Sequence, residues 1–189
     1  MLTLGIDEVG RGSWAGPLVI GAVILNSPIK GLTDSKMLTK KQRQDLIGLI
    51  KAKCLDFSLS WVWPSQIDQL GLTEATKLGI KKAISKIEQP YNEIILDGKY
   101  NYINDLPNVR CLIGADKLIP SVSAASILAK VERDKYMTKQ AKKYLNYGFE
   151  NHVGYGTKYH LNALKKYGIC EIHRLSFKPI KNIILNNDT

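Results

Sequence analysis

Cysteines, long apolar runs and acidic residues are all scarce in this chain of 189 residues. Its three cysteines, Cys54, Cys111 and Cys170, are odd in number and far apart. They predict neither a disulfide framework nor a Cys-x-x-Cys metal site, so we expect reduced thiols and a cytoplasmic location. The longest apolar run, residues 18–25, is far too short to cross a bilayer, and no leader-like segment precedes it. No membrane partner is therefore expected.

The shortage of acidic residues gives the chain a net charge of +10, because 27 Lys and Arg stand against 17 Asp and Glu. Much of the excess lies in residues 130–181, which hold 12 basic and 4 acidic residues with tyrosines interleaved among them. A basic surface that carries tyrosines favours binding to a nucleic acid. On charge alone, lysine-rich helix faces that contact only solvent remain an equal alternative.

Hydrophobic patterning predicts an α/β chain with a mixed central β-sheet flanked by helices, folded as a single domain over residues 1–189. A helical C-terminal region begins at about residue 140, and the polar residues 186–189 are expected to lie outside the fold. The predicted strands cover residues 2–8, 18–25, 56–63, 93–97 and 109–114. The predicted helices cover residues 39–54, 73–87, 121–146 and 157–167, with a capping box at Thr39 and Gln42 and a short turn or helix after Pro64.

Acidic residues follow three of the predicted strands at their carboxyl ends. Asp7 and Glu8 end the first strand, Asp97 ends the fourth, and Asp116 comes shortly after the fifth. If these strands are parallel, their carboxyl ends meet at one edge of the sheet, where open α/β sheets place their ligands. We therefore expect the carboxylates to converge, although a single acid at the end of a strand is more often a turn residue or a helix cap.

Several carboxylates in one place repel one another unless a cation compensates their charge. Oxygen ligands without a nearby His or Cys select Mg²⁺ or Mn²⁺, so the sequence predicts a divalent metal site. Neighbouring residues of a regular strand point to opposite faces, and Asp7 and Glu8 therefore cannot both reach one ion from such a strand. We expect the chain to turn at Glu8, which Gly10 would permit.

The glycine loop at Gly10-Arg11-Gly12 allows more than one interpretation. Together with Ala15 it fits the Gly-x-Gly-x-x-Ala dinucleotide fingerprint, but that motif must open a helix, and Pro17 and a β-branched run follow here. The chain also has no Gly-x-x-x-x-Gly-Lys-Ser/Thr phosphate loop. A glycine loop beside an arginine is better suited to approach a sugar-phosphate backbone.

Seven segments follow one another in the order and spacing of a known family. They are Asp7-Glu8-Val9-Gly10-Arg11-Gly12, Asp34-Ser35-Lys36, Leu96-Asp97-Gly98, Ala115-Asp116, residues 123–134, Gly154-Tyr155-Gly156-Thr157 and His173-Arg174-x-Ser176-Phe177. Over nearly its whole length the chain resembles ribonuclease HII. The resemblance implies an RNase H-like fold and an endoribonuclease that cleaves the RNA strand of RNA-DNA hybrids and incises 5′ to ribonucleotides embedded in duplex DNA.

The resemblance also implies roles for individual residues. Asp7, Glu8, Asp97 and Asp116 resemble the family's catalytic, metal-binding carboxylates, which would hold two Mn²⁺ or Mg²⁺ ions and leave 5′-phosphate and 3′-hydroxyl ends. Gly10, Arg11 and Gly12 resemble its loop at the RNA-to-DNA junction, Lys36 its phosphate-contacting lysine, and Tyr155 the tyrosine that packs on the deoxyribose beyond the junction. The departures are Val9, where Ala is frequent, and Ala115, where Gly is frequent.

Two further residues receive structural roles, and two other functions stay open. We expect Asp134 to be either a structural ion-pair residue or a helix-surface residue, and His173 to support packing or a backbone contact. The alternatives are another RNase H-fold nuclease, such as a junction resolvase or ribonuclease HIII, and a basic non-catalytic RNA- or DNA-binding module. Ribonuclease HIII carries an extra amino-terminal domain, for which no room is expected ahead of Asp7. We expect a monomer whose C-terminal region contributes to substrate binding.

Overall fold

The computed structural model describes residues 1–33 and 35–187. Five strands form one sheet in the order β3-β2-β1-β4-β5. Their bounds are β1 Thr3–Val9, β2 Leu18–Leu25, β3 Cys54–Val62, β4 Glu93–Asp97 and β5 Val109–Leu112. β1 pairs antiparallel with β2 and parallel with β4, and β4 pairs parallel with β5. The carboxyl ends of β1, β4 and β5 therefore lie at the same edge of a mixed sheet.

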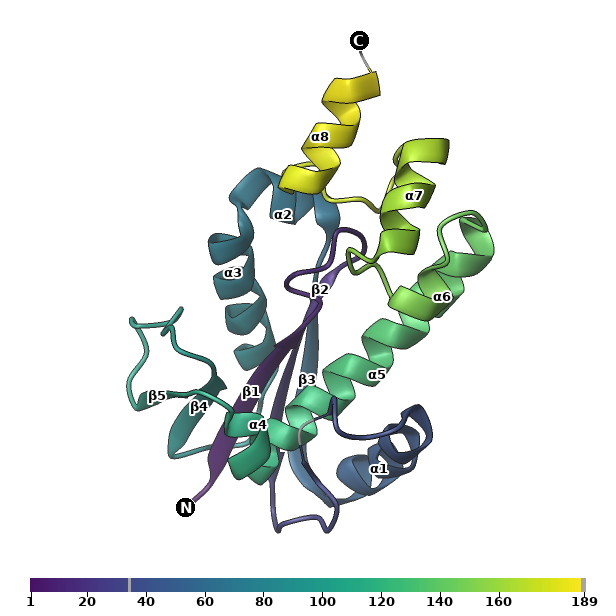
Figure 1. Ribbon diagram of the computed structural model, residues 1–189. Coiled ribbons are helices and arrows are strands. Elements are labelled where there is room, and N and C mark those ends of the chain that lie inside the picture. Colours follow the sequence, from purple (N-terminus) through teal and green to yellow (C-terminus); the bar gives the residue numbers. More distant parts are fainter. Residues whose placement is uncertain (34, 188–189) are drawn as a thin grey trace.

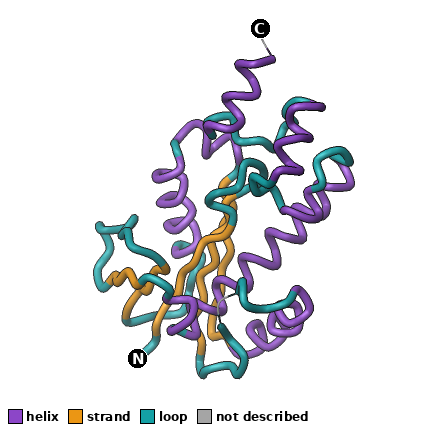
Figure 2. Tube along the Cα trace, viewed as in Figure 1, coloured by secondary structure: helices purple, strands orange, loops and turns teal. Residues whose placement is uncertain are grey.

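Helices cover both faces of this sheet (Figures 1 and 2). Their bounds are α1 Lys40–Lys53, α2 Pro64–Leu70, α3 Leu72–Ile84, α4 Ala115–Leu118, α5 Pro120–Lys143, α6 Phe149–His152, α7 Lys158–Tyr167 and α8 Lys178–Asn187. α3 packs on one face of the sheet through Ala75, Ile80 and Ala83. On the other face, α5 packs against the sheet together with α1, and the last three helices pack around the carboxyl-terminal end of α5.

Two glycines allow α5 to lie directly on the strands. A Cβ at Gly5 of β1 would stand 2.3 Å from the backbone nitrogen of Val122, and a Cβ at Gly21 of β2 would stand 2.4 Å from the carbonyl oxygen of Ala125. Any side chain at either position would push the helix away from the sheet. The small residues at the start of α5 meet these glycines, and this close approach brings Ser126 to the end of β1.

The structure confirms the α/β class, the mixed sheet and the helical C-terminal region. The strands at 18–25 and 93–97 have the predicted bounds, and the other predicted elements end within a few residues of theirs. Three helices were not predicted individually: α4, α6 and α8. The expectation that residues 186–189 lie outside the fold is wrong for 186–187, because α8 continues through them, while 188–189 lie outside the described residues. No described helix is long and apolar enough to cross a bilayer.

Candidate active site

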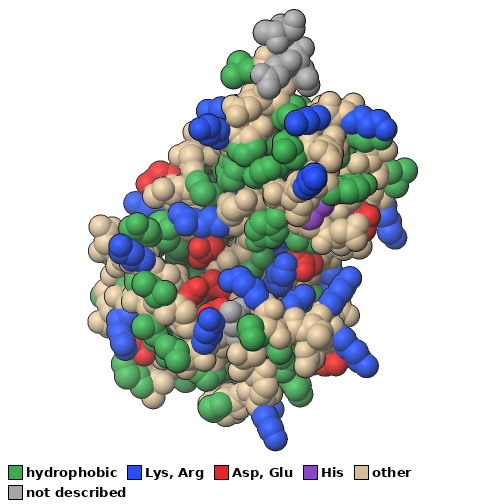
Figure 3. Space-filling view, in the orientation of Figure 1, with side chains coloured by type: hydrophobic (Ala, Val, Ile, Leu, Met, Phe, Trp, Pro, Cys, Tyr) green, Lys and Arg blue, Asp and Glu red, His purple; other side chains and the backbone are tan. Residues whose placement is uncertain are grey.

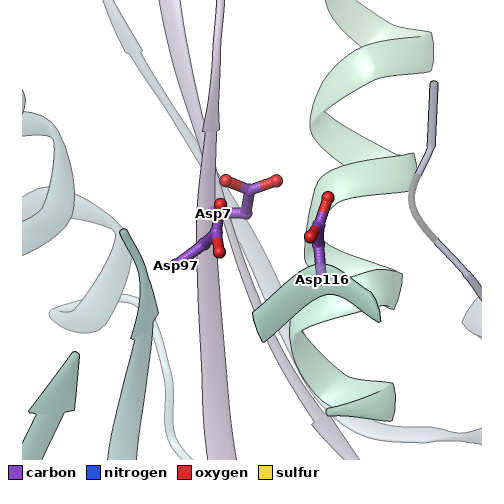
Figure 4. A group of neighbouring side chains, drawn as sticks. All are labelled: Asp7, Asp97 and Asp116. Atoms are coloured by element: carbon purple, nitrogen blue, oxygen red, sulfur yellow. The ribbon is translucent and has the colours of Figure 1, made fainter. Parts of the chain in front are cut away.

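Three carboxylates meet at the carboxyl edge of the sheet, as the positions of the acids predict. Asp7 comes from β1, Asp97 from the end of β4 and Asp116 from α4, and one oxygen from each lies within 4.8 Å of the other two (Figure 4). Gly114, in the left-handed conformation, begins the turn into α4. The N–H group of Ala115 then donates a 2.8 Å hydrogen bond to Oδ1 of Asp97, which fixes α4 beside β4. Convergence is thereby confirmed for these three acids.

The protein surroundings disfavour a negative charge on Asp7. The residue is 7% exposed, and burial together with the nearby Asp97 and Asp116 raises its pKa from 3.8 to about 7. A hydrogen bond from Ser126 and one from the Glu8 N–H group, at 2.7 Å, act in the opposite direction but do not compensate. An oxygen-only cluster of this kind fits a hard divalent cation, which would supply the missing positive charge.

Glu8 lies next to this cluster but is not part of it. The expected turn at Glu8 is wrong, because β1 stays paired with β2 in regular register through Glu8 and Val9, and the chain turns only at Gly10. Asp7 and Glu8 consequently point to opposite sides of the strand. Burial, followed by repulsion from Asp7, raises the pKa of Glu8 to about 8, while Arg11 partly lowers it. Glu8 is therefore a separate acidic group outside the three-aspartate cluster, although it lines the same cleft as Asp7 and Asp97.

A cleft of about 420 Å³ brings five of the predicted site residues, Asp7, Glu8, Lys36, Asp97 and Tyr155, together with others that were not predicted. Its lining includes Asp7, Glu8, Val9, Ser35, Lys36, Asp97, Ser126, Lys130 and Tyr155. In Figure 3, acidic side chains gather near the middle of the visible face, with Lys and Arg side chains around them. This distribution suits a polyanion whose backbone passes over a metal-binding centre.

The glycine loop lies beside the cleft without lining it. Gly10 adopts a φ of +86°, and a Cβ there would stand 2.0 Å from Nε of Arg133, so the fold itself requires glycine. Gly12 is exposed, its φ is not in the left-handed region, and a Cβ there would meet nothing within 4 Å. The Arg11 guanidinium lies 5.7 Å from the centre of the Tyr102 ring. The folded chain alone therefore gives no reason for glycine at position 12.

Comparison with known proteins decides the family. A family model described as Ribonuclease HII matches residues 4–180. The ribonuclease HII of Polaromonas sp. (strain JS666 / ATCC BAA-500) is 41% identical over 189 residues, which cover 97% of this chain and 92% of the relative. The chain belongs to the ribonuclease HII family.

Other members and a solved structure agree with this assignment. The ribonuclease HII of Endomicrobium trichonymphae is 44% identical over 182 residues, covering 95% of this chain and 87% of the relative. The ribonuclease H2 from Pyrococcus horikoshii OT3 has a TM-score of 0.85 at 27% identity, with 100% of both chains covered. The RNase H-like fold is confirmed, and the chain is a metal-dependent endoribonuclease that acts on RNA-DNA hybrids. The alternative of a non-catalytic binding module is not retained.

Three polar residues of the ribonuclease HII cleft were not predicted as site residues. Ser35 and Ser126 share a 2.9 Å hydrogen bond between their hydroxyl groups, and the Ser126 side chain also bonds to Asp7. Lys130 lies one turn after Ser126 on α5 and pairs with Asp134 at 2.9 Å, which confirms Asp134 as an ion-pair residue. The four-residue spacing of Ser126 and Lys130 places both on one face of a helix, and this spacing could have indicated from the sequence that they line the same site. Asp34 lies outside the described residues.

Three histidines that are distant in sequence form a buried cluster behind Tyr155. His173 Nδ1 accepts a 2.8 Å hydrogen bond from the Cys170 N–H group, which confirms its predicted backbone contact. With a proton on its other nitrogen, His173 can donate to His160 Nε2 at 3.0 Å, and His160 Nδ1 can then donate to the carbonyl oxygen of Tyr155 at 3.0 Å. His152 stacks on His160. This chain of bonds requires neutral imidazoles.

Acid should destabilise the protein through this cluster. Burial lowers the pKa of His160 and of His173 from 6.5 to about 4, so the unfolded chain binds protons between these values and the folded chain does not. The stability that each histidine contributes is complete above pH 6.5 and is lost as the pH falls toward 4. At pH 5 the loss is about 2 kcal/mol for each histidine.

The measurement must separate the histidines from Asp7 and Glu8, whose raised pKa values act in the opposite direction. We therefore compare urea unfolding of the wild type with that of His173→Gln at pH 7.5 and pH 5. The variant should have a lower unfolding free energy than the wild type at pH 7.5, and this difference in unfolding free energy should be about 2 kcal/mol smaller at pH 5. The same difference at both pH values would contradict the neutral-histidine assignment.

Proposed function

We propose that this ribonuclease HII chain incises duplex DNA on the 5′ side of an embedded ribonucleotide, in addition to cleaving RNA-DNA hybrids. The observation that carries the proposal is the cleft that places the Asp7 and Asp97 carboxylates beside Lys36, Lys130 and Tyr155. Such a cleft combines groups for hydrolysis of a phosphodiester with groups that bind the backbone on either side of it.

The carboxylates are proposed to hold two Mg²⁺ or Mn²⁺ ions. Asp7, Asp97 and Asp116 would together hold these ions, because their oxygens lie within 4.8 Å of one another, and Glu8 would contribute a further carboxylate from the lining of the same cleft. When bound, such ions activate a water molecule and stabilise the departing 3′ oxygen, which leaves 5′-phosphate and 3′-hydroxyl ends. Ser126 orients the Asp7 carboxylate through its hydrogen bond.

Selection of a ribonucleotide is proposed to depend on the glycine loop and Tyr155. The 2′-hydroxyl both donates and accepts hydrogen bonds, and it distinguishes RNA from DNA at a given position. Backbone groups of Gly10, Arg11 and Gly12 would read this hydroxyl, and open space at Gly12 allows a sugar to approach. Lys36 would contact a phosphate, and the half-exposed Tyr155 ring would pack on the next deoxyribose. The basic C-terminal region would extend the contact with the duplex.

A cleavage map tests the activity. A labelled DNA duplex that contains one ribonucleotide is incubated with Mg²⁺ or Mn²⁺ and, separately, with EDTA. We expect one cut at the 5′ side of the ribonucleotide, with a 3′-hydroxyl on the upstream fragment, and none in EDTA. Cleavage of the hybrid without any cut in this duplex would contradict the proposal.

The monomeric state and the cytoplasmic location of the protein stay predictions.

The role of Tyr155 has its own test. Tyr155→Ala removes the ring, and we expect incision at a single ribonucleotide to slow by about tenfold, since one aromatic stacking contact contributes about 1 to 3 kcal/mol. Tyr155→Phe keeps the ring and serves as the matched control, with incision close to that of the wild type. A Tyr155→Ala protein that incises at the wild-type rate would remove the tyrosine from the site.

A further inference from the structure

Two arginines are buried behind the glycine loop without an acidic partner. Arg133 on α5 and Arg174 between α7 and α8 are both 0% exposed. Among the described residues, no carboxylate forms an ion pair with either one. Burial of a charged group costs several kcal/mol unless all of its polar atoms find partners. Their presence therefore indicates that this place in the fold needs donors that apolar residues could not supply.

Arg174 donates hydrogen bonds to three carbonyl oxygens of the loop between β1 and β2, residues 10–17, which begins with the glycine loop. Its Nη2 donates to Gly10 at 2.7 Å, its Nη1 to Arg11 at 2.8 Å and its Nε to Gly16 at 2.9 Å. The N–H group of Arg174 also donates to the carbonyl oxygen of Trp14 at 2.8 Å. All three guanidinium nitrogens of Arg174 therefore donate a hydrogen bond to this loop.

Arg133 joins the same loop to the turn that carries Tyr155. Its Nε donates to Pro17 at 2.9 Å, its Nη2 to Ala15 at 3.1 Å and its Nη1 to Val153 at 2.9 Å, in each case to a carbonyl oxygen. Its guanidinium carbon lies 5.6 Å from the centre of the Tyr155 ring. The two arginines together hold the loop and the Tyr155 turn as one unit.

The bonds of Arg174 determine which way two peptide groups face. In a trans peptide the C=O and N–H groups point in opposite directions, and this chain has no cis peptide among its described residues. The carbonyl of Gly10 shares a peptide with the N–H group of Arg11, and that of Arg11 shares one with the N–H group of Gly12. Because both carbonyls point to Arg174, both N–H groups point away from it. Neither N–H group has an acceptor among the described residues.

We propose that Arg174 is a positioning residue for ribonucleotide selection, which aims the N–H groups of Arg11 and Gly12 at the 2′-hydroxyl of the substrate. Arg133 assists by fixing the distance between this loop and Tyr155. The inference rests on the proposed function and deepens it. A lysine could not replace Arg174, because one ammonium group cannot reach three separated carbonyls as the planar fork of a guanidinium does.

The test compares affinities, so that turnover does not interfere. Arg174→Lys is made in an Asp7→Asn parent, and binding is measured to a DNA duplex with one ribonucleotide and to the same duplex made only of DNA. We expect the preference for the ribonucleotide to fall about tenfold, which is the net worth of one or two hydrogen bonds. Affinity for the all-DNA duplex should stay the same. Arg110→Lys, at an exposed arginine paired with Glu93, is the matched control.

The outcomes separate positioning from a general loss of structure. An unchanged preference, or an equal loss of affinity for both duplexes, would overturn the proposal. If the Asp7→Asn parent binds both duplexes equally well, the proposed ribonucleotide selection and this inference are both overturned. If the parent prefers the duplex with the ribonucleotide, the proposed selection stands whatever Arg174→Lys shows. If Arg174→Lys does not fold, Arg174→Ala is measured with added methylguanidinium. A restored preference then supports positioning, and an absent one overturns it.

Discussion

Asp7→Asn lowers the rate of hybrid cleavage by roughly 1,000-fold or more, because a metal-binding carboxylate that stabilises the reacting oxygens is worth several kcal/mol. Asp7 is placed to bind metal together with Asp97 and Asp116, because one oxygen of each carboxylate lies within 4.8 Å of the other two. An amide is neutral and a far weaker ligand for Mg²⁺ or Mn²⁺ than a carboxylate. Hybrid binding should stay measurable, since the lysines and Tyr155 are unchanged. Steady-state cleavage and a filter-binding assay measure the two effects.

Asp7→Asn should also raise the stability of the metal-free protein, although it lowers the activity. The raised pKa of Asp7, about 7 against 3.8, means that ionisation destabilises the metal-free fold as the pH rises between these values. Asp7→Asn removes this charge, so the metal-free variant should be more stable than the wild type at pH 8. Asp45→Asn, at an exposed position on α1, is the matched control and should change neither property. Undiminished cleavage by Asp7→Asn would remove Asp7 from the metal site.

The sequence was sufficient for most elements because local chemistry marks them. The Thr39 and Gln42 side chains form the predicted reciprocal cap, with hydrogen bonds of 3.2 and 2.8 Å to each other's backbone N–H groups. Apolar runs end at their acids in β1 and β4 as predicted. By contrast, α4 is a single turn, and its start depends on Gly114 and on the bond from Ala115 to Asp97. A turn of that kind is determined by tertiary contacts and not by a local pattern.

The site was predictable in part for the same reason. Strand-end acids converge whenever their strands are parallel, and the gathering of Asp7, Asp97 and Asp116 followed from that rule. The position of Glu8 did not, because it depends on how far the pairing of β1 with β2 continues. Arg133 and Arg174 stood inside quoted motifs, but their bonds to the loop cross more than 100 residues of sequence. No spacing rule connects such residues, so only the folded chain reveals their role.

Gly12→Ala should abolish most of the activity without any loss of stability. Open space surrounds the position and its φ suits alanine, so the unfolding free energy should stay the same or rise by about 0.4 to 1 kcal/mol through the unfolded state. The added methyl group would stand where the sugar approaches, and we expect kcat/KM on a ribonucleotide-containing duplex to fall roughly 100-fold. Thermal melts and single-site incision measure the two properties.

Two other glycines provide the controls for this prediction. Gly10→Ala places its methyl 2.0 Å from Nε of Arg133 at a φ of +86°, so it should cost about 3 kcal/mol or more of stability. Gly48→Ala lies in open space inside α1 and should gain about 1 kcal/mol with normal activity. If Gly12→Ala incised like Gly48→Ala, close approach at the loop would be ruled out. Stability lost at Gly10 and activity lost at Gly12 would separate the inner side of the loop, which the arginines hold, from the outer side, which meets the substrate.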